Sequence, residues 1–260
     1  MTQTKCAIIT GSSSGIGHGI AEGLAAAGMN IVLNGIEPAE QIEPERLAIE
    51  KKYGAKAIYS PANMMKPDGL RDLIAAAEAA FGQVDVLVNN AGIQFVAPVE
   101  EFPDDKWEQI LSLNLSAAFY ATKAVVPGMK ARSWGRIINI ASTHGLVASR
   151  FKGACVAAKH GLVGFTKTIA LETAENGITV NAICPGYVLT PLVEKQIPDT
   201  AKARGISEEA VKRDVLLAAQ PTRKFVTVEE LAALAVFRTT DAAASITGTA
   251  LPVDGGWTAH

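Results

Sequence analysis

The 260-residue chain has few cysteines and no excess of charge of either sign. Its three cysteines, Cys6, Cys155 and Cys184, lie far apart and form no CxxC pair. This pattern argues against a disulfide framework or a zinc site and favours a reducing compartment. The formal net charge is -2, with acids and bases interspersed, so the composition gives no reason to expect a nucleic-acid partner.

The chain also has no recognisable targeting segment and no long uninterrupted apolar run. Residues 1–5 lead directly into a short apolar run and do not resemble a signal peptide. No run approaches the roughly 18 apolar residues of a membrane helix, so we expect a cytoplasmic protein without a membrane span. There is no linker, repeat or low-complexity segment, and 48% hydrophobic residues suffice for a sizeable core.

Short apolar runs alternate with helix-forming runs along the chain, which predicts an α/β fold with a parallel, doubly wound sheet flanked by helices. We expect a single domain over residues 1–260. The predicted strands are Cys6–Thr10, Ile31–Leu33, Lys56–Tyr59, Val84–Val88, Arg136–Ile140 and Thr249–Val253. The predicted helices are Gly19–Ala27, Gln41–Tyr53, Asp68–Phe81, Asp104–Lys130, Lys152–Asn176 and Thr227–Phe237.

A glycine-rich turn, Gly11–Gly17, stands between the first predicted strand and helix with the spacing G-x-x-x-G-x-G. Glycines let the backbone approach a pyrophosphate, and a helix N-terminus offers unpaired N–H groups and partial positive charge. A tight turn can use glycine for steric reasons alone. The strand–turn–helix setting nevertheless predicts dinucleotide binding in a Rossmann-like fold.

The end of the second predicted strand bears on the choice of cofactor. An NAD-binding fold often has an acid about 20 residues after the glycines, to hold the ribose 2′-hydroxyl. Here that position holds Asn34, with Glu37 slightly later. No Arg or Lys stands in the turn or directly after the strand, so NAD is favoured over NADP. Alternatively, Asn34-Gly35 is only a turn.

Acid–base residues gather around the strand predicted at Arg136–Ile140. Ser142 follows that strand, and the next helix carries Cys155 and Lys159 on one face because they are four residues apart. Reactive crevices of α/β sheets lie at the carboxyl ends of the strands, so a hydroxyl facing a helix lysine predicts an acid–base site. Asn114 is unusual inside an apolar helix. It is either functional or a satisfied amide that bends the helix.

These motifs resemble the classical short-chain dehydrogenase/reductase family along almost the whole chain. The matching residues are Thr10-Gly11-x-x-x-Gly15-x-Gly17, Asn89–Gly92, Asn114, Ser142, Lys159, Pro185-Gly186 with Thr190, and Asp254–Gly256. Within the family, the chain is similar to bacterial D-3-hydroxybutyrate dehydrogenases. That finer similarity rests on Asn34-Gly35, Gly92–Gln94, Trp134–His144, Val156–Gly161, Thr190–Gln196 and Gly255–Ala259.

The resemblance implies roles for the catalytic positions. Lys159 would bind the nicotinamide ribose and lower the pKa of a neighbouring tyrosine, which is the general acid and base of the family. Ser142 would orient the substrate oxygen, and Asn114 would hold a water of the proton relay. The NAD contacts implied by the resemblance are Gly11, Ser13, Ser14, Gly15, Ile16, Gly17, Ile36, Asn63, Met64, Asn90, Ala91, Gly92, Leu113, Lys159, Pro185, Gly186, Val188, Thr190 and Leu192; no metal is implied.

The chain departs from the family at the tyrosine itself, where it has Cys155. A thiol is several ångströms shorter than a phenol, so it should not reach an oxygen held by Ser142. Loss of a general acid typically costs about 10² to 10⁴ in rate, which predicts a chain that binds NAD but turns over poorly. The alternative is that Cys155 is a small apolar core residue. The other departures are Gly153 for serine, Asn63 for aspartate, and Arg238 for an apolar residue.

The loops expected to frame the substrate carry one cation, an imidazole and two amides. Such groups suit a small carboxylate, because hydrogen bonds to charged groups are strong, and the resemblance implies the same. Each group could also be an ordinary surface side chain or a loop cap. These residues are Gln94, His144, Lys152 and Gln196, with Ser142 beside the reacting oxygen and Tyr187 and Trp257 as apolar walls.

Residues from Tyr187 to about 225 are rich in charge and proline and are predicted to form a lid over the substrate. The expected reaction is the NAD-dependent interconversion of (R)-3-hydroxybutyrate and acetoacetate. The resemblance also implies a homotetramer built partly from the helices at 104–130 and 152–176. Two alternatives remain: a dehydrogenase for another small ketone or hydroxy acid, and a non-catalytic NAD-binding protein.

Overall fold

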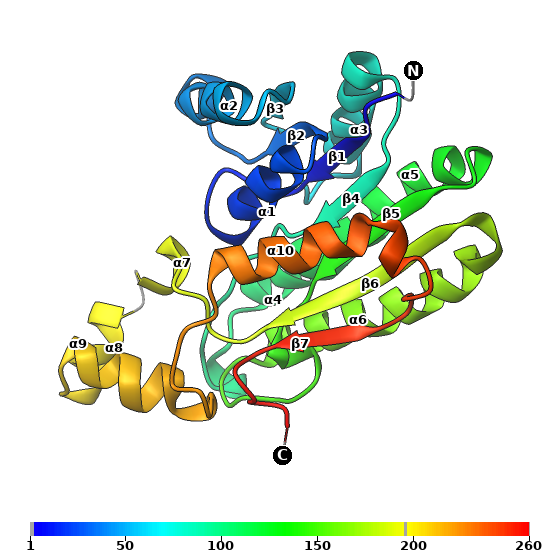
Figure 1. Ribbon diagram of the computed structural model, residues 1–260. Helices are drawn as coiled ribbons and strands as arrows, with labels where there is room; N and C mark the ends of the chain where they lie inside the picture. Colours follow the sequence, from blue (N-terminus) through cyan, green and yellow to red (C-terminus); the bar gives the residue numbers. More distant parts are fainter. Residues whose placement is uncertain (1–2, 195–196, 260) are drawn as a thin grey trace.

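The computed structural model of the protein describes residues 3–194 and 197–259. It contains a seven-stranded sheet with the order β3-β2-β1-β4-β5-β6-β7, in which every neighbouring pair is parallel (Figure 1). The predicted doubly wound α/β fold is therefore confirmed. The strands are β1 (Cys6–Ile9), β2 (Asn30–Asn34), β3 (Ala57–Ser60), β4 (Val86–Asn89), β5 (Gly135–Ile140), β6 (Ile178–Pro185) and β7 (Ala250–Val253).

Helices cover both faces of the sheet. On one face α1 packs against both α2 and α10, and on the other α5 packs against α3 and α6. The helices are α1 (Gly15–Ala26), α2 (Ala39–Tyr53), α3 (Pro67–Phe81), α4 (Asp104–Leu111), α5 (Ala117–Ala131), α6 (Gly153–Thr173), α7 (Pro191–Glu194), α8 (Ile197–Arg204), α9 (Glu208–Ala210) and α10 (Val228–Thr239). Short 3₁₀ or π turns are η1 (Val99–Glu101), η2 (Ser112–Ser116), η3 (Thr143–Gly145), η4 (Ala174–Asn176), η5 (Val211–Leu216), η6 (Leu217–Ala219) and η7 (Asp241–Ala243).

One strand was missing from the prediction. All eight residues of β6 are buried, and β6 lies between β5 and β7. It is hard to recognise in the sequence because β6 follows the long helix α6 after only a short turn, which ends at Gly177 with a φ of 66°. Its polar residues also interrupt the apolar run by which a buried strand is recognised. Asn181 is one of them, and it is satisfied internally by donating to the Ile246 carbonyl at 2.9 Å.

The predicted long helix at 104–130 is continuous but changes its winding in the middle. The π turn η2 separates α4 from α5 and contains Asn114, which is buried. By length and composition, Asp104–Ala131 is the one helix of the described chain that could cross a membrane. We had not expected such a helix, because the sequence contains no long uninterrupted apolar run. Core helices pass the same test, and α5 packs on β4, β5 and α3.

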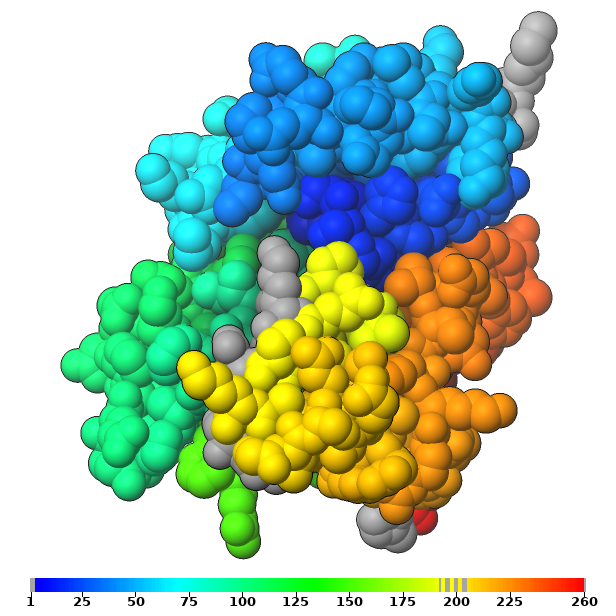
Figure 2. Space-filling view, turned by 90° about the vertical axis from the view of Figure 1, so that its left-hand side faces the viewer, coloured from blue at the N-terminus to red at the C-terminus, as the bar shows by residue number. Residues whose placement is uncertain are grey.

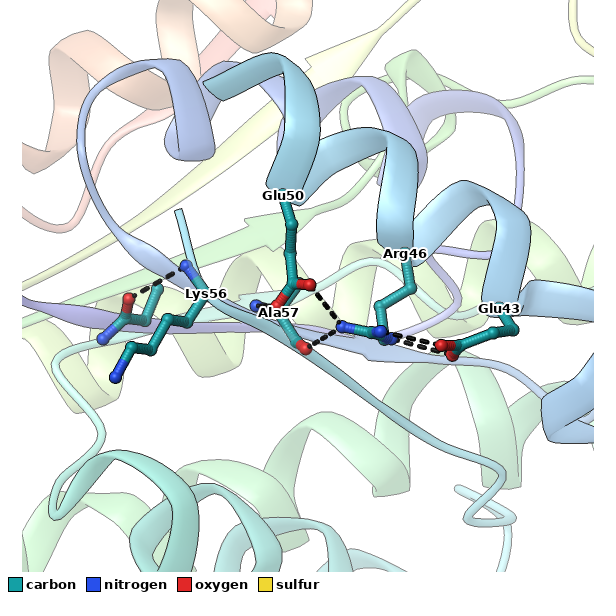
Figure 3. A network of polar contacts seen from close by, with 6 residues as sticks. Glu43, Arg46, Glu50, Lys56 and Ala57 are labelled. Atoms are coloured by element: carbon teal, nitrogen blue, oxygen red, sulfur yellow. Dashed lines mark hydrogen bonds and ion pairs between the residues drawn. The ribbon is translucent and has the colours of Figure 1, made fainter. Parts of the chain in front are cut away.

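A network of polar contacts fastens α2 to the edge strand β3 (Figure 3). Arg46 donates from Nε and Nη2 to the two carboxylate oxygens of Glu43, at 2.8 and 2.7 Å, and from Nη1 to the Ala57 carbonyl at 2.8 Å. Glu50 accepts from the Ala57 amide at 2.9 Å. That bond, and then Arg46, hold the pKa of the Glu50 carboxyl below its usual value. The network fixes β3 beside β2, whose end faces the cavity described below.

Two arginines are buried together, Arg238 of α10 and Arg136 of β5. Arg238 is 1% exposed and Arg136 is 3% exposed. Arg136 donates to the Gly135 and Gly177 carbonyls, and Arg238 donates to the Ile246 carbonyl. Within residues 3–194 and 197–259, however, Nε and Nη1 of Arg238 have no acceptor. Burial, and then repulsion by Arg136, lower the pKa of Arg238.

We therefore expect the substitution Arg238→Met to stabilise the protein. An unpaired buried charge is costly, and replacing even a buried ion pair by apolar side chains of similar volume is often neutral or stabilising by about 1–4 kcal/mol. For a chain of this size, Tm should rise by about 2–4 °C per kcal/mol, which calorimetry would measure. The control Arg238→Lys keeps the charge and should give no gain. A lower Tm for the methionine variant would mean that Arg238 has a partner in solution.

Candidate active site

The carboxyl ends of the strands open into one cavity of about 510 Å³. It lies where the strand order reverses between β1 and β4, the usual ligand position of a doubly wound sheet. Most of the predicted site residues line this cavity, and they come from several different strands, helices and loops. They are Gly11, Ser13, Ser14, Gly15, Ile16, Ile36, Asn63, Met64, Asn90, Ala91, Gly92, Gln94, Leu113, Asn114, Ser142, His144, Lys152, Cys155, Lys159, Pro185, Gly186, Tyr187, Val188, Thr190 and Trp257.

Three predicted contacts are not among these lining residues. Gly17 lies behind the turn, where an added Cβ would overlap the Asn90 amide and the Gly11 carbonyl. Glycine is therefore needed here for close packing, and a direct cofactor contact of Gly17 stays a prediction. The side chain of Leu192 and the whole of Gln196 fall outside the described part of the chain.

The backbone of the glycine turn is supported by Asn90, which follows β4. Gly11 and Gly15 have φ values of 60° and 58°, which side chains other than glycine rarely adopt. Asn90 donates from Nδ2 to the carbonyls of Thr10 and Gly11, at 2.9 and 2.8 Å. The asparagine therefore caps the turn, and the N-terminus of α1 faces the cavity, where its unpaired N–H groups favour an anion.

The end of β2 decides between the two interpretations of Asn34. This residue is 1% exposed; its Oδ1 accepts from the Gly11 amide at 3.1 Å, and its Nδ2 donates to the Ser60 and Ala62 carbonyls at 3.0 Å. Its polar atoms are committed to the fold, so it holds the turn and does not take the place of a ribose-binding acid. Glu37 is the acid at the cavity, where it accepts from the Ser13 hydroxyl at 3.0 Å.

Ser142 and Asn114 are both positioned by backbone contacts. Ser142 follows β5, and its Oγ accepts from the His144 amide at 3.1 Å. Asn114 exchanges two hydrogen bonds of 2.9 Å with the backbone of Ile93. Its side chain is thus a satisfied amide that holds the loop after β4. It also lines a second cavity of about 10 Å³ together with Lys159, about the room that one water needs.

Cys155 and Lys159 lie on the inner face of α6. Cys155 is 6% exposed, and both residues line the main cavity. The lysine is buried and donates from Nζ to the Ile140 carbonyl at 2.7 Å. Burial lowers the pKa of Lys159, while Cys155 and Cys184 act in the opposite direction. Cys155 is therefore both a buried residue and part of the cavity wall, so a larger side chain there would extend into the cavity.

The other two cysteines are buried thiols of low reactivity. Burial raises the pKa of Cys6 to about 12 and that of Cys184 to about 11, and both are free thiols. Among residues 3–194 and 197–259, no group of three or more His, Cys, Asp and Glu side chains could hold a metal ion.

Four side chains form the end of the cavity beyond Ser142. His144 and Tyr187 both pack on Trp257, His144 edge-on at 5.4 Å and Tyr187 stacked at 5.5 Å between ring centroids. Lys152 donates from Nζ to the Tyr187 hydroxyl at 3.1 Å. Burial, and then the charge of Lys152, lower the pKa of His144 to about 4. The imidazole is therefore neutral at pH 7, and Lys152 supplies the positive charge at this end.

Some residues of the cavity were not assigned from the sequence. Most are neighbours of assigned residues in the same loops, and only their position relative to the strand ends reveals them. They are Gly35, Ala62, Met65, Ile93, Ile140, Ala141, Pro191 and Val193, together with Glu37, which had been considered only for the ribose.

Comparisons with known proteins agree with this geometry. The family model described as short chain dehydrogenase matches residues 5–201. The chain is 56% identical over 257 residues to a D-beta-hydroxybutyrate dehydrogenase of Rhizobium meliloti (99% of this chain, 100% of that protein). It is 51% identical over 260 residues to the D-beta-hydroxybutyrate dehydrogenase of Cupriavidus necator, with both chains fully covered.

A solved structure extends the agreement to the fold. The L-sorbose reductase of Gluconobacter frateurii, in complex with NADPH and L-sorbose, superposes with a TM-score of 0.94 at 33% identity, over 99% of this chain and 98% of that one. Together with the family match over most of the sequence, these similarities confirm the resemblance found in the sequence. The chain belongs to the short-chain dehydrogenase family.

Proposed function

We propose that the protein is an NAD-dependent oxidoreductase that interconverts (R)-3-hydroxybutyrate and acetoacetate. One observation carries the proposal: the glycine turn, Ser142 with Lys159, and the cation Lys152 all line a single cavity. A hydroxyl and a lysine suit the carbonyl end of a substrate, and an ammonium suits a carboxylate. The two relatives named D-beta-hydroxybutyrate dehydrogenase support the same substrate.

The residues of the cavity fit a bound dinucleotide, because the glycine turn and the N-terminus of α1 line it together. When bound, a nicotinamide supplies or accepts the hydride. Ser142 would hold the substrate oxygen, and Lys159 would bind the nicotinamide ribose. The small cavity lined by Asn114 and Lys159 would hold the water through which a proton leaves the site.

Glu37 supports NAD as the cofactor. Its carboxylate stands at the cavity beside Ser13 and Ile36, where it accepts from the Ser13 hydroxyl and the Ile36 amide. A carboxylate at this place would accept hydrogen bonds from ribose hydroxyls and repel a 2′-phosphate. The L-sorbose reductase was solved with NADPH, so fold similarity alone does not decide between the two cofactors.

We expect Glu37→Gln to reduce the preference for NAD over NADP by about tenfold. This corresponds to about 1.4 kcal/mol, within the range of about 1–4 kcal/mol for two charges about 4 Å apart near a protein surface. The ratio of kcat/KM for the two cofactors measures it. Glu40→Gln changes the same charge at an exposed position of α2 and is the matched control. An equal shift in both variants would reject the role of Glu37.

We infer further that Cys155 impairs the reaction, because a thiol at this position is too short to exchange a proton with an oxygen held by Ser142. The same residue favours a second candidate, an NAD-binding protein without catalytic activity. Steady-state NADH formation from (R)-3-hydroxybutyrate, beside NADH binding followed by fluorescence, distinguishes them. Slow but measurable turnover supports the impaired enzyme, binding with no turnover supports the second candidate, and no binding rejects both.

Other sequence-based expectations stay predictions. Residues 187–225 form a small apolar cluster of their own around Ile197, Val211 and Leu216. In Figure 2 this segment (yellow to orange) lies below the N-terminal elements (blue) and beside the residues near 100 (green), a position that suits a lid. Exposed aromatic residues on α4 and α5, namely Trp107, Phe119 and Tyr120, suit a subunit contact. Hydrogen exchange with ligands would test the lid, and sedimentation would test the tetramer.

A further inference from the structure

We infer that the Tyr187 hydroxyl and the Lys152 ammonium together bind the substrate carboxylate, so that Tyr187 determines specificity for acids over neutral carbonyl compounds. The inference rests on the proposed function, because it assigns the acidic end of that substrate. It changes the role of Tyr187, which the sequence had predicted to be an apolar wall.

Tyr187 is held rigidly at the cavity. It lies just beyond the end of β6, after Gly186. Its backbone is fixed on both sides: its amide donates to the Gln220 side chain, and its carbonyl accepts from the Val226 amide at 2.9 Å. Its ring stacks on Trp257, with 17° between the ring planes. A ring fixed in this way loses little freedom when its hydroxyl binds a ligand.

The hydrogen bond between Lys152 and Tyr187 can run in only one direction. An ammonium has three donors and no acceptor, so the phenol oxygen accepts from Nζ, at 3.1 Å. The hydrogen of the phenol therefore points to another atom, and the ammonium keeps two further N–H groups. Both side chains line the same cavity. Two neighbouring donors, one of them charged, match the two oxygens of a carboxylate, which accept such pairs strongly.

Lys152 and Tyr187 are well placed to bind a carboxylate at this end of the cavity, whereas the N-terminus of α1 favours an anion at the glycine turn. His144, which packs on the same Trp257 ring, is neutral at pH 7 because burial depresses its pKa. The other lysine of the cavity, Lys159, is buried and bonded to the Ile140 carbonyl. The one carboxylate that lines the described cavity, Glu37, stands at the glycine turn and so does not compete for Lys152.

The test is Tyr187→Phe in the Cys155→Tyr background, which removes the hydroxyl and keeps the ring. The dissociation constant of acetoacetate from the enzyme–NADH complex, and KM for (R)-3-hydroxybutyrate, should rise by about tenfold or more. A hydrogen bond to a charged group contributes about 1.5–3 kcal/mol, and 1.4 kcal/mol is tenfold. The loss should fall on KM and not on kcat. KM for the methyl ester, a neutral probe of the same shape, should change less than about twofold.

Lys152→Met gives a second, independent readout. Once the ammonium is gone, the additional loss caused by Tyr187→Phe should be smaller than in its presence, because the two donors act on one carboxylate. Tyr187→Trp, which restores a ring but offers Lys152 no acceptor, should weaken acetoacetate binding like the phenylalanine variant. The inference would be overturned if Tyr187→Phe raised KM equally for the acid and its methyl ester. It would also be overturned if the losses of acetoacetate binding caused by Tyr187→Phe and Lys152→Met were fully additive.

The outcomes also separate this inference from the proposed function. If the Cys155→Tyr parent binds acetoacetate and turns over, and Tyr187→Phe leaves binding unchanged, only the role of Tyr187 is wrong. If the parent binds NADH but neither binds acetoacetate nor oxidises (R)-3-hydroxybutyrate, the proposed substrate is wrong, and the inference is wrong with it.

Discussion

Cys155→Tyr is expected to raise kcat for the oxidation of (R)-3-hydroxybutyrate by about 10²- to 10⁴-fold, the usual contribution of a general acid or base. Cys155 lines the cavity on the same face of α6 as Lys159, so a tyrosine there would extend into the cavity that Ser142 also lines. Its phenol would then be near the ammonium of Lys159, which favours the phenolate and lowers the pKa of the tyrosine from about 10.

The matched control is Cys155→Phe, which adds the same ring without the hydroxyl. Its kcat should equal that of the unaltered chain, since phenylalanine fills the cavity wall but has no hydroxyl that could transfer a proton. Cys155→Ser tests the opposite case, a hydroxyl on a side chain too short to reach the substrate oxygen, and its kcat should also stay low. If the phenylalanine variant gained as much as the tyrosine variant, the gain would come from packing, and the proton-transfer role of position 155 would be rejected.

Lys159→Met in the Cys155→Tyr background is expected to lower kcat/KM by about 10²-fold or more. Two losses contribute: a charged hydrogen bond to the nicotinamide ribose, worth about 1.5–3 kcal/mol, and the effect of the ammonium on the phenol. Without the ammonium, the pKa of the tyrosine at position 155 rises toward about 10. The rising limb of the pH profile for oxidation should therefore move to higher pH.

The pH profile separates this catalytic effect from a structural one. Lys159 is buried, and burial lowers its pKa, so removing the charge should leave Tm unchanged or raise it. Lys167→Met removes an exposed lysine from the same helix and should change kcat/KM by less than about twofold. A Lys159→Met variant with an unshifted pH profile would show that this lysine does not act on the phenol.

Much of the fold could be predicted because local pattern and tertiary position agree. The strand–glycine–helix run at Cys6–Ala26 is recognisable from the sequence, since its glycines, buried strand and helix all follow from short-range rules. Ser142 could be placed at a strand end for the same reason. The fold confirmed these elements within a few residues, which is the usual uncertainty of element boundaries.

The remaining features depend on contacts between distant segments. The sequence left open whether Asn34 stands in for the ribose-binding acid or only forms a turn, and only the tertiary structure reveals that its amide is used by Gly11, Ser60 and Ala62. The polar role of Tyr187 could not be predicted either, because Lys152 is distant in sequence and meets it only at the cavity. β6 was missed because its polar residues are satisfied by loops that follow much later.

The central claim is that this chain has an intact site for NAD and a small carboxylate in which only the proton donor at position 155 is deficient. One paired measurement tests it most directly: the NADH dissociation constant and kcat for (R)-3-hydroxybutyrate, on the unaltered chain and on Cys155→Tyr. We predict dissociation constants equal within about threefold and kcat values at least about 10²-fold apart. Comparable kcat values in the two proteins would contradict the account, because another group would then supply the proton.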